Sequence, residues 1–196
     1  MVLVLVALSL ACQSPANSHD PETVTPDGWE PLVSRDYDAA VGSDWLVYQT
    51  DSLPIAEGAE DGRQMGYSDI VLQELEAIAE DQATFGIDII MIREVDGVAT
   101  RINGTNCEDI EQSQSEYEEV MHLYLGQLGF ELSAVESPIG WAIFASKPPI
   151  QPGVDHYIAL RVFDSGCPLS FNLFVANGDN QALDDFTGFL GTVSEK

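Results

Sequence analysis

The three histidines are the side chains best suited to acid–base or metal chemistry near neutral pH. His19 lies in a proline-rich N-terminal segment, where nothing would position it. His122 follows Glu118 and Glu119 by about one helical turn, which can place a carboxylate and an imidazole on one face, although a solvated helix face explains the spacing as well. His156 stands at the start of an expected strand, where we expect a surface residue. The histidines therefore assign no catalytic residue and no metal ligand.

A search for larger catalytic and metal-binding motifs also assigns no catalytic residue. The sequence contains no GxSxG elbow, no phosphate loop and no HExxH motif. Asp36, Asp38 and Asp44 have the start of a calcium-loop pattern, but the glycine is displaced and the final glutamate is missing. A solvated loop is the expectation, with specific calcium binding as the alternative. We predict no cofactor.

The charge balance is strongly one-sided. The 196 residues include 33 Asp and Glu against 7 Lys and Arg, a formal net charge of −26, while 45% of residues are hydrophobic. Such a chain can bury a core, but it has no basic surface with which to bind nucleic acid. No Lys or Arg occurs from Ile102 to Ser146. The acidic surface is expected to keep the protein solvated, and the alternative is that it recruits a basic protein partner.

The N-terminus predicts export. Residues 1–11 are uncharged and almost wholly apolar, as in the core of a signal peptide, and are too few to span a membrane. Ser9-Leu10-Ala11-Cys12 resembles the lipobox of bacterial lipoproteins, with Ser9 and Leu10 in the reverse of the usual order. The resemblance implies lipid attachment at Cys12 and a membrane anchor; the alternative is an ordinary signal with Cys12 incidental. Residues 12–28 then form a flexible tether.

The remaining two cysteines predict one disulfide bond. Cys107 and Cys167 both lie among turn residues, and an exported chain enters an oxidising compartment. Their bond would close a loop of about 60 residues and stabilise the fold by about 4 kcal/mol in the chain-entropy model. Free thiols are the first alternative, and a nucleophile or metal ligand is the second.

Hydrophobic patterning predicts the elements that must position these residues. Helical stripes follow Ser68 and a Ser115–Glu118 capping box, while Asp96-Gly97 marks a hairpin turn. The stripe after the capping box has an expected buried face of Tyr117, Val120 or Met121, Tyr124 and Leu128, and the stripe of the last helix consists of Leu183, Phe186, Phe189, Leu190 and Val193. Alternation with polar residues predicts a half-buried strand with Leu169, Phe171, Leu173 and Val175 on one face. The fold class is therefore α+β, with a mainly antiparallel sheet of about five to seven strands, two or three packed helices, and one domain over residues 29–196. The expected strands are 44–50, 87–95, 98–102, 130–136, 141–147, 157–163 and 169–175; the expected loop is 57–66; the last helix starts near residue 180.

The order of elements from residue 115 onward, a helix, two hairpins and a closing helix, resembles the PsbP-like fold. This fold is named for an extrinsic photosystem protein and is shared by some small bacterial lipoproteins. The resemblance implies a binding or assembly role. The expected function is thus a non-enzymatic, lipid-anchored envelope protein that presents an acidic binding or assembly domain. The alternative is an exported hydrolase with a carboxylate-based site.

Overall fold

The structure is a computed structural model, and it confirms the α+β class with antiparallel sheets. The predicted signal peptide, Cys12 and most of the predicted tether lie outside the residues that it describes. These are 25–49, 55–64, 66–85, 87–95, 98–105, 107, 112–138, 140–176 and 178–196.

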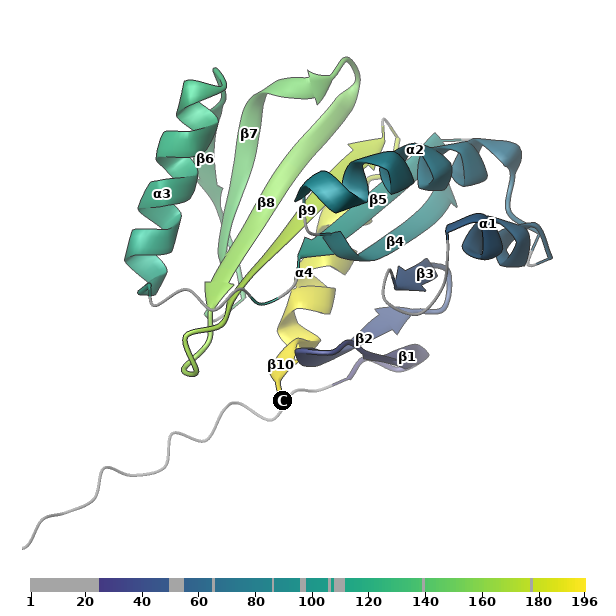
Figure 1. Cartoon of the computed structure of the whole chain (residues 1–196), viewed down its shortest axis with the longest axis horizontal. Coiled ribbons are helices and arrows are strands. Elements are labelled where there is room, and N and C mark those ends of the chain that lie inside the picture. The colour runs from purple at the N-terminus through teal and green to yellow at the C-terminus, as the bar shows by residue number, and fades with distance from the viewer. Residues whose placement is uncertain are drawn as a thin grey trace, which may run out of the picture.

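A seven-stranded antiparallel sheet forms the centre of the molecule, in the order β3-β4-β5-β9-β8-β7-β6 (Figure 1). Four of its strand pairs, β4-β5, β6-β7, β7-β8 and β8-β9, join strands that follow each other directly in the chain. β9 joins the two halves by pairing with β5 on one side and β8 on the other. The strands are β3 (Leu46–Gln49), β4 (Ile87–Val95), β5 (Val98–Thr105), β6 (Glu131–Val135), β7 (Ala142–Gln151), β8 (Val154–Val162) and β9 (Pro168–Ala176).

A second, three-stranded sheet packs below the first, in the order β1-β2-β10. It is built from β1 (Trp29–Val33), β2 (Tyr37–Gly42) and β10 (Ser194–Glu195). The last element, β10, returns to pair with β2, so the two ends of the described chain meet in this sheet. Four helices are described: α1 (Ile55–Gln64), α2 (Asp69–Phe85), α3 (Gln114–Gln127) and α4 (Ala182–Thr192).

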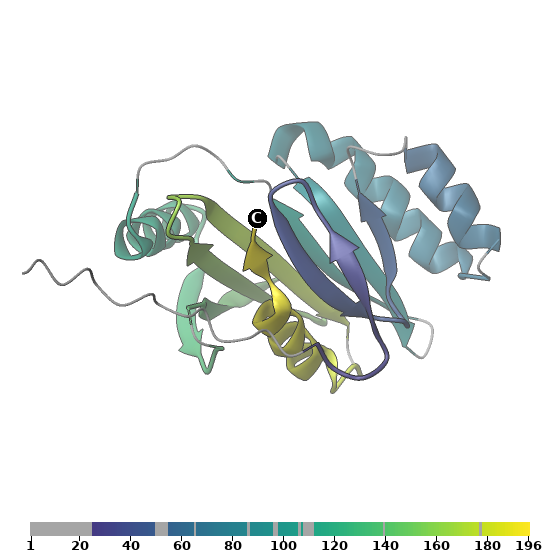
Figure 2. The ribbon, with the colours of Figure 1, turned by 90° about the horizontal axis from the view of Figure 1, so that it is seen from below.

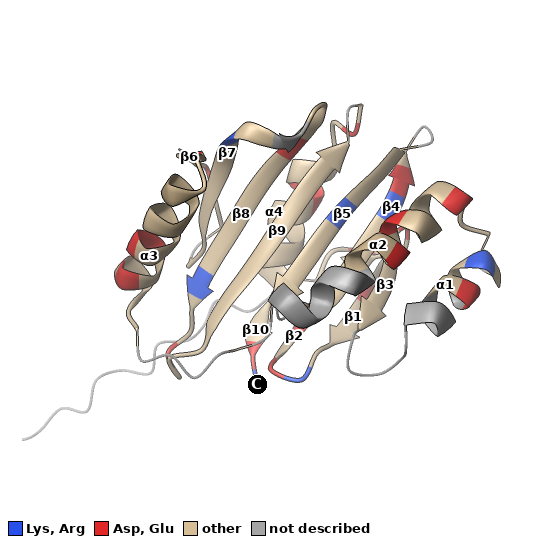
Figure 3. Cartoon of the chain, turned by 45° about the horizontal axis from the view of Figure 1, so that its top comes forward, with Lys and Arg blue, Asp and Glu red and all other residues tan. Residues whose placement is uncertain are grey.

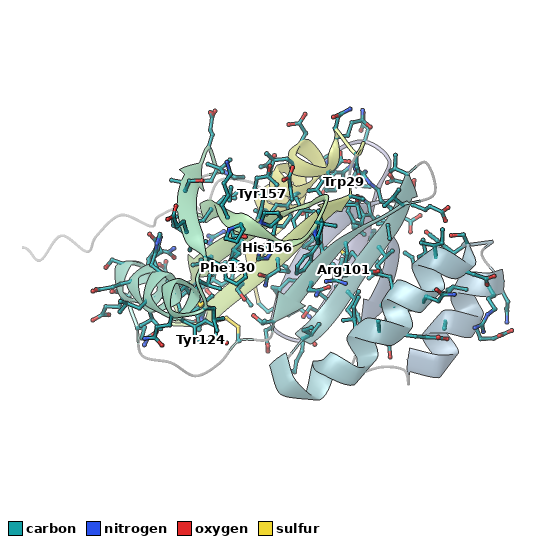
Figure 4. All side chains as sticks on the ribbon, turned by 90° about the horizontal axis from the view of Figure 1, so that it is seen from above. Trp29, Arg101, Tyr124, Phe130, His156 and Tyr157 are labelled. Carbon is teal, nitrogen blue, oxygen red and sulfur yellow. A yellow bond between two sulfur atoms is a disulfide. The ribbon has the colours of Figure 1, made fainter. Side chains whose placement is uncertain are left out.

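The helices and the small sheet cover the two faces of the large sheet differently. Figure 2 shows α4 and the small sheet together against one face, which we call the closed face. On the opposite face, α2 lies over β4 and β5, whereas α3 lies over β6 and β8, and the two helices do not meet (Figure 4). We call this the open face. The middle strands are therefore covered on one side and lie between two helices on the other.

The closed face holds the largest hydrophobic core. It joins Tyr37 of the small sheet, Phe171 of β9 and Phe189 of α4, whose rings meet edge to face. Phe171 lies so close to the backbone of β5 that a Cβ on Gly104 would stand 2.5 Å from its ring. A glycine at this position is therefore required by packing. Smaller clusters under α2 and under α3 fill the two ends of the open face.

Two local predictions are corrected by the structure. The predicted loop 57–66 is largely helix α1, because the small buried residues Ala59 and Gly62 let this polar segment pack against α2. The capping box lies two residues earlier than predicted: Ser113 Oγ accepts from the Glu116 amide, and Glu116 accepts from the Ser113 amide. The sequence carries Ser-x-x-Glu in both frames, so the pattern itself could not choose between them.

Other predictions of secondary structure are close to the observed bounds. The predicted strands 44–50, 87–95, 98–102, 130–136, 141–147, 157–163 and 169–175 correspond to β3 through β9. The stripe of the last helix is confirmed by the burial of Phe186, Phe189 and Leu190 against the core. The segment from Asp36 to Asp44, expected as a loop, contains strand β2 instead.

Candidate functional site

The gap between α2 and α3 on the open face is a cavity of about 570 Å³. This volume is in the range of small-molecule binding sites. Figure 4 shows α3 and α2 as its two walls and the middle strands as its floor, with Arg101 and His156 on that floor and Tyr124 and Phe130 at the α3 side. The site is thus formed by elements that are distant in sequence.

The floor is polar because of strand alternation. Arg101, Asn103 and Thr105 alternate along β5 and line the cavity, while Ile102 between them is buried in the closed core. On β9, Asn172 and Phe174 line the cavity and Phe171 and Leu173 face the closed core. Since successive side chains of a strand point to opposite faces, each of these strands carries an apolar face and a mixed face.

An aromatic ring stands between two nitrogen-rich side chains at the centre of this floor. Arg101 on β5 pairs in register with Phe174 on β9, and Phe174 pairs with His156 on β8. The Arg101 guanidinium carbon lies 4.1 Å from the centre of the Phe174 ring, and the His156 ring stacks on the same ring at 4.6 Å, tilted by 17°. Such contacts fix the orientation of both polar groups.

His156 is buried, not exposed as the sequence predicted. Its side chain is 4% exposed, and it lies between Ser146 and Asn172, with Nδ1 2.7 Å from Ser146 Oγ and Nε2 3.2 Å from Asn172 Oδ1. Because Asn172 Oδ1 can only accept, Nε2 carries the proton and Nδ1 accepts from the Ser146 hydroxyl. Burial lowers the pKa of His156 to about 4. The hydrogen bond with Asn172 acts against this shift, and the nearby positive charge of Arg101 adds to it. The ring is therefore neutral at pH 7.

The positive charge of Arg101 is matched within the cavity. Its Nη1 donates to Glu74 Oε1 of α2 at 2.7 Å, so the ion pair connects the floor to the α2 wall. With His156 neutral, the charged groups lining the described cavity cancel. The cavity is thus close to neutral inside a chain with a net charge of −26.

Asn103 carries the floor's hydrogen-bond acceptor that has no partner among the residues the structure describes. Its side chain is 7% exposed, and its Oδ1 makes no hydrogen bond with any residue that the structure describes. A buried acceptor left unsatisfied costs about 1–3 kcal/mol. Residues held in this condition next to a cavity are candidates for contact with a ligand.

The walls are apolar and partly open. Leu125 is the buried residue of α3, whereas Tyr124 and Leu128 are exposed, although the sequence placed both on a buried stripe. The reason is that the cavity takes the place of a packing layer beneath this end of α3. The apolar side chains lining the walls are Ala77 and Ile78 of α2, Ile87 of β4, Met121, Tyr124, Leu125 and Leu128 of α3, and Phe130.

The groups around the cavity are poorly suited to hydrolysis. Ser146 and His156 are hydrogen-bonded, but Ser146 does not line the cavity and is itself buried. A substrate in the cavity would therefore not reach its hydroxyl. Among the described lining residues Glu74 is the single carboxylate, and it is held by Arg101. A mechanism that uses two carboxylates as acid and base would need a second one, which the described lining residues do not supply.

The predicted disulfide pair is brought together. Cys107 and Cys167 are bonded, with their Cα atoms 5.1 Å apart. They join the end of β5 to the start of β9, and the enclosed 60-residue loop carries α3, β6, β7 and β8. The bond therefore fixes the half of the molecule that supplies the α3 wall.

The three aspartates of the candidate calcium loop are placed apart, each next to a different basic group. Asp36 accepts a hydrogen bond from Arg35, and this bond lowers the pKa of the carboxyl. Asp38 lies 3.4 Å from Lys196, and Asp44 binds Arg93. Within the described residues no group of three or more His, Cys, Asp or Glu side chains is placed to hold a metal ion.

Arg93 forms a second polar cluster, on the closed side. It is 4% exposed, donates to Asp179 with Nε at 3.0 Å and Nη2 at 2.7 Å, and also binds Asp185 of α4. Its guanidinium lies 4.7 Å above the Trp45 ring. Burial opposes the charge, but these bonds raise the pKa of Arg93 and lower that of Asp179. This fully paired cluster fastens α4 to the sheet and is structural.

Acidic residues occur on all four helices (Figure 3). His122 is exposed on α3, and its ring lies edge to face with Phe144 at 4.7 Å between ring centres, so its solvated position agrees with the simpler expectation. None of the described helices has the length and apolarity needed to cross a lipid bilayer.

Comparisons with known proteins found little sequence similarity. No family model matches the sequence, and no curated protein matches it. A solved structure that resembles the chain is the solution structure of cyanobacterial PsbP (CyanoP) from Synechocystis sp. PCC 6803. It has 7% identity and a TM-score of 0.48, and the alignment covers 93% of this chain and 100% of that one.

Proposed function

We propose that this protein is a non-enzymatic binding protein that takes a small, largely apolar molecule into the cavity between α2 and α3. The observation that carries the proposal is a 570 Å³ cavity with apolar walls and a floor of oriented polar groups. Sites that bind small molecules combine these same features. The described floor offers fixed hydrogen-bonding groups, and its lining includes one carboxylate, Glu74, which is held by Arg101; both features support binding over the hydrolase alternative.

We place this domain outside the cytosol, held at a membrane by lipid on Cys12. The apolar N-terminal run and the cysteine that follows it are the basis for the anchor. A disulfide between turn cysteines is typical of exported proteins. Fractionation of cells that express the full chain tests the anchor: Cys12→Ala should move the protein from the membrane to the soluble fraction. Unchanged membrane association would contradict it.

Probe binding tests the cavity. N-phenyl-1-naphthylamine, a neutral two-ring dye that fluoresces in apolar surroundings, should bind saturably to the protein. Ala77 lines the cavity from an exposed position on α2, so Ala77→Trp should block the mouth without disturbing the core. We expect at least a tenfold loss of affinity in this variant.

Gln73 supplies the matched control. It is exposed on the same helix and does not line the cavity. Gln73→Trp adds the same side chain and should leave dye affinity unchanged. Equal affinity of the two variants, or no saturable binding by the wild-type protein, would refute the proposal.

A further inference from the structure

We infer that the ligand of this cavity is an uncharged aromatic or similarly flat apolar molecule that donates one hydrogen bond to Asn103 Oδ1. This inference rests on the proposed function and adds the chemical class of the ligand. It follows from three properties of the cavity: the unpaired acceptor on its floor, the cancelled charge around it, and the shape and polarity of its walls.

The unpaired acceptor sets the hydrogen-bonding requirement. Asn103 belongs to the middle strand β5, and its neighbour across the strand pair, Asn172, already accepts from His156. Thr105 Oγ1 is likewise occupied, at 3.0 Å from Ser170 Oγ. Of the floor's hydrogen-bond acceptors named here, Asn103 Oδ1 is the one that lacks a partner among the described residues. An N–H or O–H group on the ligand would satisfy it, whereas a ligand without a donor would leave it desolvated.

The electrostatics select an uncharged ligand. Arg101, the basic group of the floor, is bound to Glu74, so an anion would have to displace a carboxylate that is already in place. The whole chain carries a net charge of −26 and repels anions at long range. A cation would meet the Arg101 guanidinium on the floor. An uncharged molecule avoids all three costs.

The walls select a flat apolar body. Leu128 and Tyr124 on the α3 side face Ala77 and Ile78 on the α2 side across the gap. Tyr124 and Phe130 both lie at the α3 wall in Figure 4, where a ring of the ligand can pack edge to face or stack against them. A ring system lying between the two helices can thus reach the β5 floor with a donor at its edge.

Three related compounds test this class on the wild-type protein. N-phenyl-1-naphthylamine has one N–H donor, and 1-naphthyl phenyl ether replaces that N–H with oxygen while keeping the two ring systems. 8-Anilino-1-naphthalenesulfonate keeps the N–H and adds a negative charge. We expect the amine to bind about fivefold more tightly than the ether, because the ether cannot make the one neutral hydrogen bond. The affinity of the amine is measured from its own fluorescence, and that of the ether by displacement of the amine. The sulfonate should bind more weakly than the amine.

Replacing Asn103 tests whether this residue causes the preference for the amine over the ether. Asn103→Leu is close in shape and has no acceptor, so the amine and the ether should bind this variant with equal affinity. Gln73→Leu is the matched control, because it also replaces an amide side chain with leucine, at an exposed position that does not line the cavity. It should keep the fivefold preference.

The outcomes separate the two proposals. If no compound binds saturably, the proposed function fails. If the compounds bind and Ala77→Trp blocks them, but the wild type does not prefer the amine to the ether, the cavity binds ligands and the hydrogen-bond inference is wrong. A preference that persists in Asn103→Leu also overturns it, and tighter binding of the sulfonate overturns the uncharged class.

Discussion

The two faces of the seven-stranded sheet are made by the same strands and differ in what covers them. On the closed face, α4 and the small sheet meet over the centre of the strands, and the covered side chains form one continuous core. On the open face, α2 and α3 cover the two ends, and the uncovered middle carries Arg101, Asn103 and His156. Polar groups are tolerated in the middle of a sheet where no second layer has to pack on them.

The two faces also treat their polar groups differently. Arg93 on the closed side is bound by three aspartates, and its cluster contains more acceptors than it needs. Asn103 on the open side has an acceptor with no partner among the residues that the structure describes. Pairing avoids the cost of an uncompensated buried charge in the Arg93 cluster. The closed core also holds a buried hydroxyl without a partner among the described residues, that of Tyr37, but it is enclosed by packing, whereas Asn103 lines a cavity. This contrast is the reason for placing the functional site on the open face.

Strand β9 allows a direct comparison, because Phe171 and Phe174 lie on opposite faces. Phe171 is fully buried among three aromatic rings, so Phe171→Ala should lower the free energy of unfolding by about 4 kcal/mol. Phe174 borders the cavity and is partly exposed, so Phe174→Ala should cost about 1–2 kcal/mol. Urea denaturation of both variants measures the difference. Equal losses would mean that the open face is packed as tightly as the closed one.

The disulfide supports the open face through its α3 wall. The bond encloses α3, β6, β7 and β8, so replacing both Cys107 and Cys167 by serine should cost about 3–4 kcal/mol through greater entropy of the unfolded chain. The melting temperature should fall by about 10 °C. Hydrogen exchange should also accelerate more in α3 than in α4. Uniform acceleration through both helices would show that the bond stabilises the two faces alike.

The polar groups of the two faces should affect the free energy of unfolding in different pH ranges, and His156 represents the open face. His156 titrates near pH 6.5 when unfolded and near pH 4 when folded, so the unfolded state binds more protons between these values. Stability should be complete above about pH 6.5 and fall by about 3 kcal/mol as the pH drops to 4. His156→Gln should flatten this region in urea titrations at several pH values.

The closed face should respond at lower pH. Asp179 is buried, yet its hydrogen bonds with Arg93 lower its pKa below the ordinary value. Its contribution to the free energy of unfolding is therefore complete above the pKa of the unfolded state and is lost as the pH falls through the pKa of the folded state. That loss should appear below about pH 4. It should remain in His156→Gln. A variant that loses both regions would show that the two clusters titrate together.

The smallest predicted effect has the opposite sign. Asn103→Leu removes an acceptor that has no partner among the described residues, so the ligand-free protein should gain up to about 1 kcal/mol of stability. Thermal melts of the wild type and the variant test this. A stability gain together with loss of the amine preference is typical of a binding residue. A loss of more than about 1 kcal/mol would mean that Asn103 has a structural role.

Several features were determined by the sequence alone. Alternation of Leu169, Phe171 and Leu173 with polar residues predicted a half-buried strand, and the spacing of Phe186, Phe189 and Leu190 predicted the buried side of the last helix. These patterns depend on the periodicity of a single element, which the chain carries locally. The pairing of Cys107 with Cys167 was also predicted, since these are the two of the three cysteines that remain when Cys12 is assigned to lipid attachment.

The cavity and its chemistry were decided by tertiary structure. Alternation on β5 shows that Asn103 and Ile102 face opposite ways, but it does not reveal that α2 and α3 leave the Asn103 side open. His156 was predicted at the surface because neighbours in sequence do not show burial by β7 and β9. Asp44 resembled a calcium ligand until Arg93 was placed beside it, across 49 residues of sequence. Burial and pairing are properties of the assembled layers, and a single strand or turn carries no record of which partners will cover it.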